Sequence, residues 1–200
     1  MNKRNTESIF NKTFDPMYDK TKHISNSLSS TMSVVHRTDV QNLPNIMSEG
    51  LKIEKSVTPS GATQIIEISK RIKTELGITE DRYKTIYTTF NDKELTDSDI
   101  NELQSRREAL IEFKINVNDS DIFVANFDHI NKAIFNQIDF NRTKNERYLY
   151  DTLHGMERNL YDYWESFVPI SEYMNERKYD NPEILIFHDI EPNNLTILTT

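Results

Sequence analysis

The 200-residue chain contains no cysteine, which removes three kinds of chemistry at once. It has no disulfide framework, no thiolate nucleophile and no cysteine-based zinc site. Its five histidines show no metal-ligand spacing such as His-Glu-x-x-His, so no metal is expected. The chain has only four glycines, too few for a glycine-rich phosphate loop, and a Rossmann-type nucleotide site is therefore excluded.

Long hydrophobic runs are also absent. No stretch approaches the length of a membrane span, and the N-terminus lacks the apolar core of a signal peptide. We therefore expect a cytoplasmic protein with no membrane partner. The net charge of −8 argues against passive binding of nucleic acid, which needs a basic surface. It remains compatible with an enzyme that visits nucleic acid briefly through one local patch.

The composition divides the chain into two parts. Residues 1–30 are rich in Ser, Thr, Asn and Lys and predict either a loose N-terminal arm or one short docked helix. Residues 31–200 are predicted to form a single domain. Short strands with interspersed helices, without regular βαβ alternation, indicate an α+β fold.

Periodicity and turn residues predict the individual elements. Strands are expected at 33–37, 84–90, 110–117, 121–127, 183–187 and 195–198. Helices are expected at 39–49, 62–76, 97–108 and 129–139, followed by a mostly helical segment at 142–179 that Gly155 and Pro169 interrupt.

The most informative stretch is His36-Arg37-Thr38, followed by Asn42-Leu43-Pro44-Asn45-Ile46 and Glu49-Gly50-Leu51. A short strand delivers a His and a Thr at its end, and a helix then begins near Asp39. That helix ends at Gly50, which fits the left-handed C-cap position. A histidine where a strand gives way to a helix lies at the lip of a sheet, where ligands are usually held. The alternative is a plain strand-turn-helix whose histidine only caps a turn.

A second motif lies near the C-terminus, at Pro182-Glu183-Ile184-Leu185-Ile186. Here a carboxylate stands at the start of an apolar strand. A glutamate in that position is costly unless it is solvated, paired or used. Taken alone, the motif is also compatible with an ordinary edge-of-strand glutamate that faces water.

Together the two motifs resemble ADP-ribosyltransferase-fold enzymes, most closely the DarT-type toxins that modify nucleic acid using NAD. His-x-Thr, Asn-Leu-x-x-Ile and Gly-Leu are similar to the family's opening, and Glu183 lies in a context similar to its catalytic Ala-Glu-(Phe/Val/Leu)-Leu-Val. The resemblance covers roughly residues 33–198. It implies a split mixed or antiparallel sheet core flanked by helices, with NAD as co-substrate and no metal.

The resemblance implies two catalytic residues. Glu183 would hold the ribose 2′-hydroxyl, stabilise the developing positive charge and deprotonate the acceptor. Arg71 matches a functional arginine ahead of the middle strand and would contact a phosphate. The alternative for Arg71 is a solvated position on a helix face beside Lys70 and Lys73.

The resemblance also implies a cofactor-binding set. His36 and Thr38 would orient a ribose and the nicotinamide amide, and Tyr87 would pack on the nicotinamide ring. The full set is His36, Arg37, Thr38, Tyr87 and Thr88. The middle strand, Ile86-Tyr87-Thr88-Thr89-Phe90, departs from the Val-Pro-Phe-Tyr-Phe wording common in DarT-like proteins.

The acceptor is expected to be a base of single-stranded DNA or RNA. Position 181 is Asn, whereas arginine-modifying enzymes usually carry Glu-x-Glu, and this favours a nucleobase. Eight aromatic residues between Arg142 and Asp180 would suit stacking on bases, although most of them are expected in the core. Such an enzyme would act as a toxin or a phage-defence or counter-defence factor, with an antitoxin as partner. The alternatives are a protein-directed ADP-ribosyltransferase, an RNA 2′-phosphotransferase and a catalytically silent binding module.

Overall fold

The computed structural model describes residues 30–53, 63–91, 95–143, 145–176 and 179–199. Apart from Ser30, the predicted N-terminal arm lies outside these residues. None of the described helices is long and apolar enough to cross a membrane.

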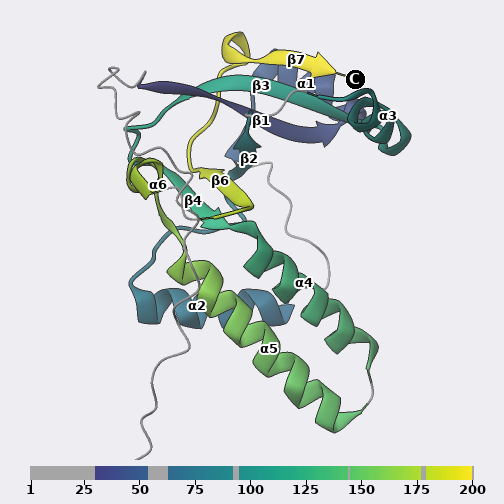
Figure 1. Cartoon of the computed structure of the whole chain (residues 1–200), viewed down its shortest axis with the longest axis vertical. Helices are drawn as coiled ribbons and strands as arrows, with labels where there is room; N and C mark the ends of the chain where they lie inside the picture. The colour runs from purple at the N-terminus through teal and green to yellow at the C-terminus, as the bar shows by residue number, and fades with distance from the viewer. Residues whose placement is uncertain (1–29, 54–62, 92–94, 144, 177–178, 200) are drawn as a thin grey trace, which may run out of the picture.

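The described residues form six α-helices and seven strands, in agreement with the predicted α+β class. In chain order the elements are β1 (Thr31–Asp39), the 3-10 turn η1 (Val40–Asn42), α1 (Leu43–Glu49), α2 (Thr63–Leu76), β2 (Ile86–Phe90), α3 (Asp97–Arg106), β3 (Glu108–Asn116), β4 (Ile122–Asn126), α4 (Phe127–Arg142), α5 (Glu146–Glu165), β5 (Val168–Pro169), α6 (Ile170–Glu176), β6 (Pro182–Ile186), the 3-10 turn η3 (Pro192–Asn194) and β7 (Thr196–Thr199). Figure 1 shows β1, β3 and β7 at one end of the molecule and α2, α4 and α5 gathered at the other.

All seven strands join one open sheet in the order β5-β4-β6-β2-β1-β3-β7, and every pair of neighbours is antiparallel. β1 pairs with β3 along its whole length of nine residues. Its register with β2 is much shorter and covers only Val34 with Phe90 and Val35 with Thr89. The second half of β1 therefore stays on β3 and leaves β2.

The turn from β1 into α1 follows from local chemistry. The Asp39 side chain accepts a hydrogen bond from the Gln41 backbone N–H (2.9 Å) and caps η1. α1 then begins at Leu43, with Pro44 in its first turn, where a missing N–H costs nothing. Gly50 ends α1 with φ +86° and ψ −178°, so the predicted left-handed C-cap is wrong in its ψ angle. The extended ψ instead leads Leu51 into a backbone bridge with Ile190.

Two hydrophobic clusters stabilise the sheet on opposite faces. The first cluster contains Ile111, Phe113 and Ile115 of β3 together with residues of β2, β4 and β6. The second cluster lies between the sheet and α2, α4 and α5. β6 contributes to both, because Ile184 belongs to the first and Leu185 to the second. Each such fully buried side chain stabilises the fold by about 1.5–3 kcal/mol.

The predicted interruption of the last helical segment is correct at Pro169 and wrong at Gly155. α5 runs through Gly155, whose missing side chain lets Asn136 of α4 approach closely; a Cβ there would lie 2.9 Å from the Asn136 Nδ2. Pro169 follows the end of α5 and lies in β5, ahead of α6. In the middle of the chain, α3 starts at a capping box of Thr96 and Asp99, with Thr96 as its cap.

Candidate functional site

A pocket lies where β1 and β2 separate. Its volume is about 460 Å³, and small-molecule sites are typically about 300–1,000 Å³. His36 bridges the opening, with its Nδ1 2.8 Å from the carbonyl oxygen of Tyr87. The end of β1, α1, the segment after α1 and the start of β2 line the pocket through His36, Arg37, Thr38, Asn42, Asn45, Ile46, Gly50, Leu51, Lys52, Thr85, Ile86 and Tyr87.

The protonation of His36 follows from its hydrogen bond. Because a carbonyl can only accept, the Nδ1 atom must carry the proton that it donates to Tyr87, and this leaves Nε2 with a lone pair. Burial lowers the pKa of His36, and the backbone bond to Tyr87 opposes this lowering. The ring is therefore neutral at pH 7, and Nε2 can accept a hydrogen bond from a hydroxyl or amide group of a ligand.

The pocket is locally cationic. Arg37 and Lys52 line it, and no carboxylate is present among the described residues of the lining. Each cation has an acidic partner outside the lining: Arg37 lies 3.5 Å from Glu108 and Lys52 lies 3.2 Å from Asp189. The Arg37 side chain is 54% exposed, so its ion pair is weak. An anionic ligand could bind the two cations of the lining in competition with Glu108 and Asp189.

The two predicted residues of β2 have different surroundings. Tyr87 lines the pocket, and its hydroxyl donates to the backbone carbonyl of Arg82. Burial raises the pKa of Tyr87 to about 12, so the phenol stays neutral. Thr88 is 3% exposed, is not part of the pocket lining, and its Oγ1 has no hydrogen-bond partner among the described residues. The structure therefore brings Tyr87 to the pocket and leaves Thr88 in the core.

Glu183 lies at the start of β6 and is 5% exposed. Its Oε1 accepts a hydrogen bond from the Arg82 Nη2 (2.6 Å), and its Oε2 accepts one from the Tyr163 hydroxyl (2.9 Å). The Arg82 Nε donates in turn to the Tyr163 oxygen (3.0 Å). A buried carboxylate is costly unless it is paired, and this arrangement supplies both an opposite charge and a second donor.

The charge states of this cluster follow from its burial. Burial by itself would lower the pKa of Arg82, but Tyr163, Glu183 and Tyr87 raise it above its usual value. Burial raises the pKa of Tyr163 well above the ordinary value, and the charge of Glu183 raises it further while Arg82 opposes the rise. Tyr163 is therefore a neutral phenol that can donate its proton in the hydrogen bond to Glu183.

His36 and Glu183 lie on opposite faces of the sheet. The register pairs Tyr87 with Leu185, so the Tyr87 ring and Glu183 share one face. The register of β1 on β2 puts His36 on the other face. Glu183 is accordingly not part of the pocket lining. Tyr87 connects the two groups, because its carbonyl accepts from His36 and its ring lies 4.6 Å from the Arg82 guanidinium.

Arg71 is not brought to either group. It lies on the outer side of α2, with its side chain 55% exposed, and pairs with Glu157 of α5. Both partners are solvent-accessible, so the pair contributes little to stability. Arg71 thus occupies the solvated helix-face position that the sequence left open as its alternative.

Sequence reasoning missed three residues of this region: Arg82, Tyr163 and Lys52. Arg82 lies in the polar stretch between α2 and β2, where no local pattern distinguishes it from other surface arginines. Tyr163 belongs to the apolar face of α5, with Met156 and Leu160, and helical periodicity marks it only as a core residue. Lys52 follows Gly50-Leu51 directly, so its closeness to the first motif was a usable signal.

No group of three or more His, Asp and Glu that could hold a metal ion occurs within residues 30–53, 63–91, 95–143, 145–176 and 179–199. The pocket lining combines polar and cationic side chains with the aliphatic residues Ile46, Leu51 and Ile86.

Comparison of the chain with protein-family models, with curated proteins and with solved structures found no match. The family resemblance therefore rests on the two sequence motifs alone.

Proposed function

We propose that the chain is an NAD-dependent mono-ADP-ribosyltransferase that transfers ADP-ribose to a base of single-stranded DNA or RNA. The observation that carries the proposal is the cationic pocket in the opening between β1 and β2. It gathers His36, Arg37, Thr38 and Tyr87, four of the five residues that the family resemblance assigns to NAD. β6, which carries Glu183, is the next strand in the sheet after β2.

The residues of the pocket fit the chemistry of NAD. The pyrophosphate is anionic, and Arg37 and Lys52 are the cations that would bind it. The unprotonated Nε2 of His36 would accept a hydrogen bond from a ribose hydroxyl or from the nicotinamide amide, and the Thr38 hydroxyl can donate or accept. Tyr87 contributes to the pocket through the backbone carbonyl that holds His36, while its neutral ring lies on the Glu183 face against Arg82.

Glu183 would stabilise the positive charge that develops on the ribose during the reaction. When bound, NAD provides a nicotinamide–ribose bond whose cleavage leaves positive charge on the ribose. Because Glu183 lies outside the pocket lining and on the other face of the sheet, the nicotinamide ribose would have to extend beyond the pocket to reach it. The carboxylate would then accept a hydrogen bond from the ribose 2′-hydroxyl and stabilise that charge. A carboxylate has about four acceptor positions, and Arg82 and Tyr163 use two of them in the described structure.

A nucleobase acceptor is favoured over a protein arginine. Asn181 stands where arginine-modifying enzymes have a second glutamate, and its side chain donates to Asp128 of α4 (3.0 Å). Tyr148, Tyr150 and Tyr161 of α5 are exposed and could stack on bases. Tyr163, Trp164 and Tyr173 are buried, as expected for most aromatics of this segment.

The first experiment follows transfer and cleavage together. Purified protein is incubated with labelled NAD and one of three acceptor pools: single-stranded DNA, total RNA or cell-extract protein. Label in a nucleic-acid pool, lost with Glu183→Gln, supports the proposal. Label in the protein pool alone would leave the enzyme class standing and replace the acceptor. We expect Glu183→Gln to reduce nicotinamide release by about 10²–10³-fold, as for other losses of transition-state charge stabilisation.

One observation favours a second candidate, a binding module without transfer activity. Glu183 is buried, and Arg82 and Tyr163 occupy both of its oxygens. A silent module would bind a nucleotide in the cationic pocket and release no nicotinamide. NAD would then raise the melting temperature of the wild type and of Glu183→Gln equally, without any product.

The proposed binding of NAD in the pocket predicts which basic residues contact its phosphates. Arg37→Ala and Lys52→Ala should each raise KM for NAD by about 10-fold, since a hydrogen bond to a charged group contributes about 1.5–3 kcal/mol. Arg71→Ala, which removes an exposed partner of Glu157, should leave KM within about twofold. Steady-state nicotinamide release measures all three. A large effect of Arg71→Ala alone would return the phosphate role to Arg71.

A further inference from the structure

The Glu183 cluster contains two residues to which the proposed function assigns no role. Resting on that function, we infer that Arg82 and Tyr163 are positioning residues that hold the Glu183 carboxylate in one orientation for NAD cleavage. They come from the segment before β2 and from α5, so two separate parts of the chain converge on the start of β6.

The three side chains form a closed ring of hydrogen bonds. Arg82 donates to Oε1 of Glu183, Tyr163 donates to Oε2, and Arg82 also donates to the Tyr163 oxygen, at 2.6, 2.9 and 3.0 Å. Rotation of the carboxylate about its terminal bond would break at least one of these bonds. Since the Arg82 and Glu183 side chains are only 12% and 7% exposed, water can do little to replace a lost partner.

The two supporting residues are themselves held in place. The Arg82 guanidinium lies 4.6 Å from the ring centre of Tyr87 and 5.6 Å from that of Tyr163. Tyr87 also donates its hydroxyl to the Arg82 carbonyl. Tyr163 is fully buried and packs edge-on against Trp164, with ring centres 5.1 Å apart. The carboxylate is therefore oriented by groups that cannot easily move.

This arrangement matters for a reaction in which charge develops at one ribose carbon. A carboxylate stabilises that charge best when it is oriented in advance, and a misplacement of about 1 Å can reduce the rate by about 10²-fold. The ring of hydrogen bonds among Arg82, Tyr163 and Glu183 leaves acceptor capacity on both Glu183 oxygens for a ligand hydroxyl. It also links the carboxylate through Arg82 to Tyr87, which lines the cationic pocket.

A purely structural ion pair would have different consequences. Loss of a structural pair lowers the stability of the protein but leaves the turnover number of the folded molecules unchanged. Loss of a positioning group lowers kcat while binding of NAD in the pocket is retained. The two roles can therefore be separated by measuring kcat, KM and melting temperature on the same variants.

The test uses two conservative substitutions and a matched control. Tyr163→Phe removes one buried hydroxyl and keeps the aromatic ring. Arg82→Lys keeps the charge but replaces a planar group that donates from two nitrogens with a single ammonium nitrogen. The control is Tyr173→Phe, which removes a hydrogen-bonded hydroxyl from a buried tyrosine of the other core cluster. Nicotinamide release from NAD, with water as acceptor, gives kcat and KM for the full-length protein and each variant.

We expect Tyr163→Phe and Arg82→Lys each to lower kcat by about 10–100-fold, with KM within about threefold of wild type. Because they disturb one unit, the double variant should lose little more than the worse single variant. Tyr173→Phe should keep kcat within about twofold, and its melting temperature should fall less than that of Tyr163→Phe, because the lost hydrogen bond is to a neutral carbonyl. If folded Tyr163→Phe has the kcat of the wild type, the positioning inference is overturned and the proposed function is unaffected. Absence of nicotinamide release from the wild type would overturn the proposed function and this inference with it.

Discussion

His36 is the residue whose surroundings predict a pH dependence of stability. Burial lowers its pKa, so the folded state binds fewer protons at this ring than the unfolded state. The corresponding stabilisation is fully present above the unfolded pKa of about 6.5 and is lost as the pH falls through the folded pKa. Acidification from pH 7.5 to 5.5 should therefore lower the free energy of unfolding through this residue.

The measurement is urea denaturation of the wild type and of His36→Asn across that pH range. Asparagine retains an N–H donor for the Tyr87 carbonyl but does not titrate. The variant should lose less free energy of unfolding than the wild type on acidification. Parallel curves for the two proteins would show that His36 does not bind fewer protons in the folded state.

At the scale of the elements, the two glycines with positive φ at helix ends are not equivalent. Gly50 has φ +86°, and a Cβ there would lie 2.1 Å from the Ile190 carbonyl oxygen. Gly77 has φ +70° and no atom within 4 Å of such a Cβ. The difference arises because the chain after α1 bonds directly to Ile190, with both backbone hydrogen bonds at 2.9 Å. α1 thus ends against backbone that cannot move aside.

We expect Gly50→Ala to lower the free energy of unfolding by more than about 3 kcal/mol, since a clash with rigid backbone adds to a conformational strain of about 1–3 kcal/mol. Gly77→Ala should cost about 1 kcal/mol, from its φ alone. Denaturant unfolding of both variants gives the comparison. Equal losses would mean that the contact between α1 and Ile190 is looser than the geometry indicates.

At the scale of the whole molecule, β6 couples the two core clusters, because its side chains alternate between them. Trp164, the single tryptophan of the chain, lies in the second cluster and reports on that face of the sheet. Ile111 lies in the first cluster and is fully buried. A cavity at Ile111 should therefore destabilise the environment of Trp164 through the shared strands.

Ile111→Ala should lower the free energy of unfolding by about 2–5 kcal/mol. The unfolding curves of this variant, followed by tryptophan fluorescence and by far-ultraviolet circular dichroism, should have the same midpoint denaturant concentration. Leu160→Ala, in the second cluster, should behave in the same way. Separate midpoints for the two probes would mean that the halves of the molecule unfold independently.

The fold was predictable where local pattern determines local structure. The strand β3 and the helices α2 and α4 lie where periodicity predicts them. The helix predicted from Asp39 instead begins at Leu43, because β1 continues on β3 as far as Asp39. The errors have a common cause, since the conformations at Gly155 and Gly50 depend on contacts with another segment of the chain.

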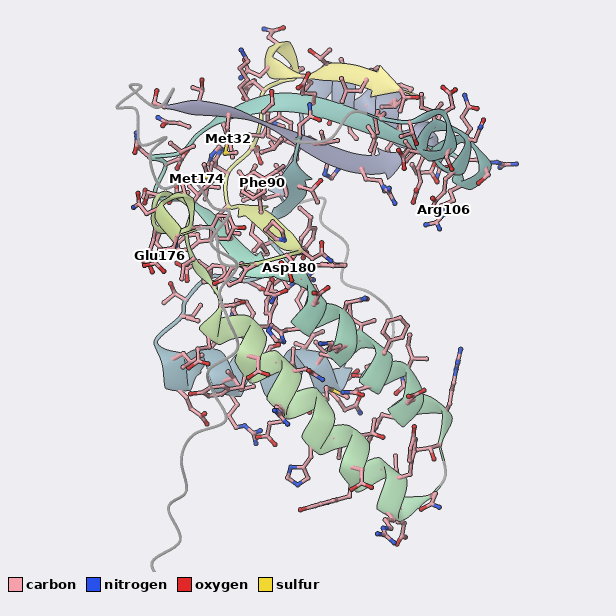
Figure 2. All side chains as sticks on the ribbon, in the orientation of Figure 1. Met32, Phe90, Arg106, Met174, Glu176 and Asp180 are labelled. Carbon is pink, nitrogen blue, oxygen red and sulfur yellow. The ribbon has the colours of Figure 1, made fainter. Side chains whose placement is uncertain are left out.

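Long-range contacts also form a second pocket. Figure 2 shows that Met32 and Phe90, far apart in the chain, lie together between β1 and α6. With Tyr173, Tyr179 and Asp180 they line a second pocket of about 310 Å³.

The candidate site divides along the same line. The position of His36, Arg37 and Thr38 at a strand end beside a helix was predictable from the chain alone, because adjacent residues need no partner to form that turn. The pairing of Glu183 with Arg82 rather than with Arg71, across a separation of 101 residues, depends on the tertiary structure. Strand register and helix packing bring those charges together, and neither can be read from residues that are neighbours in the chain.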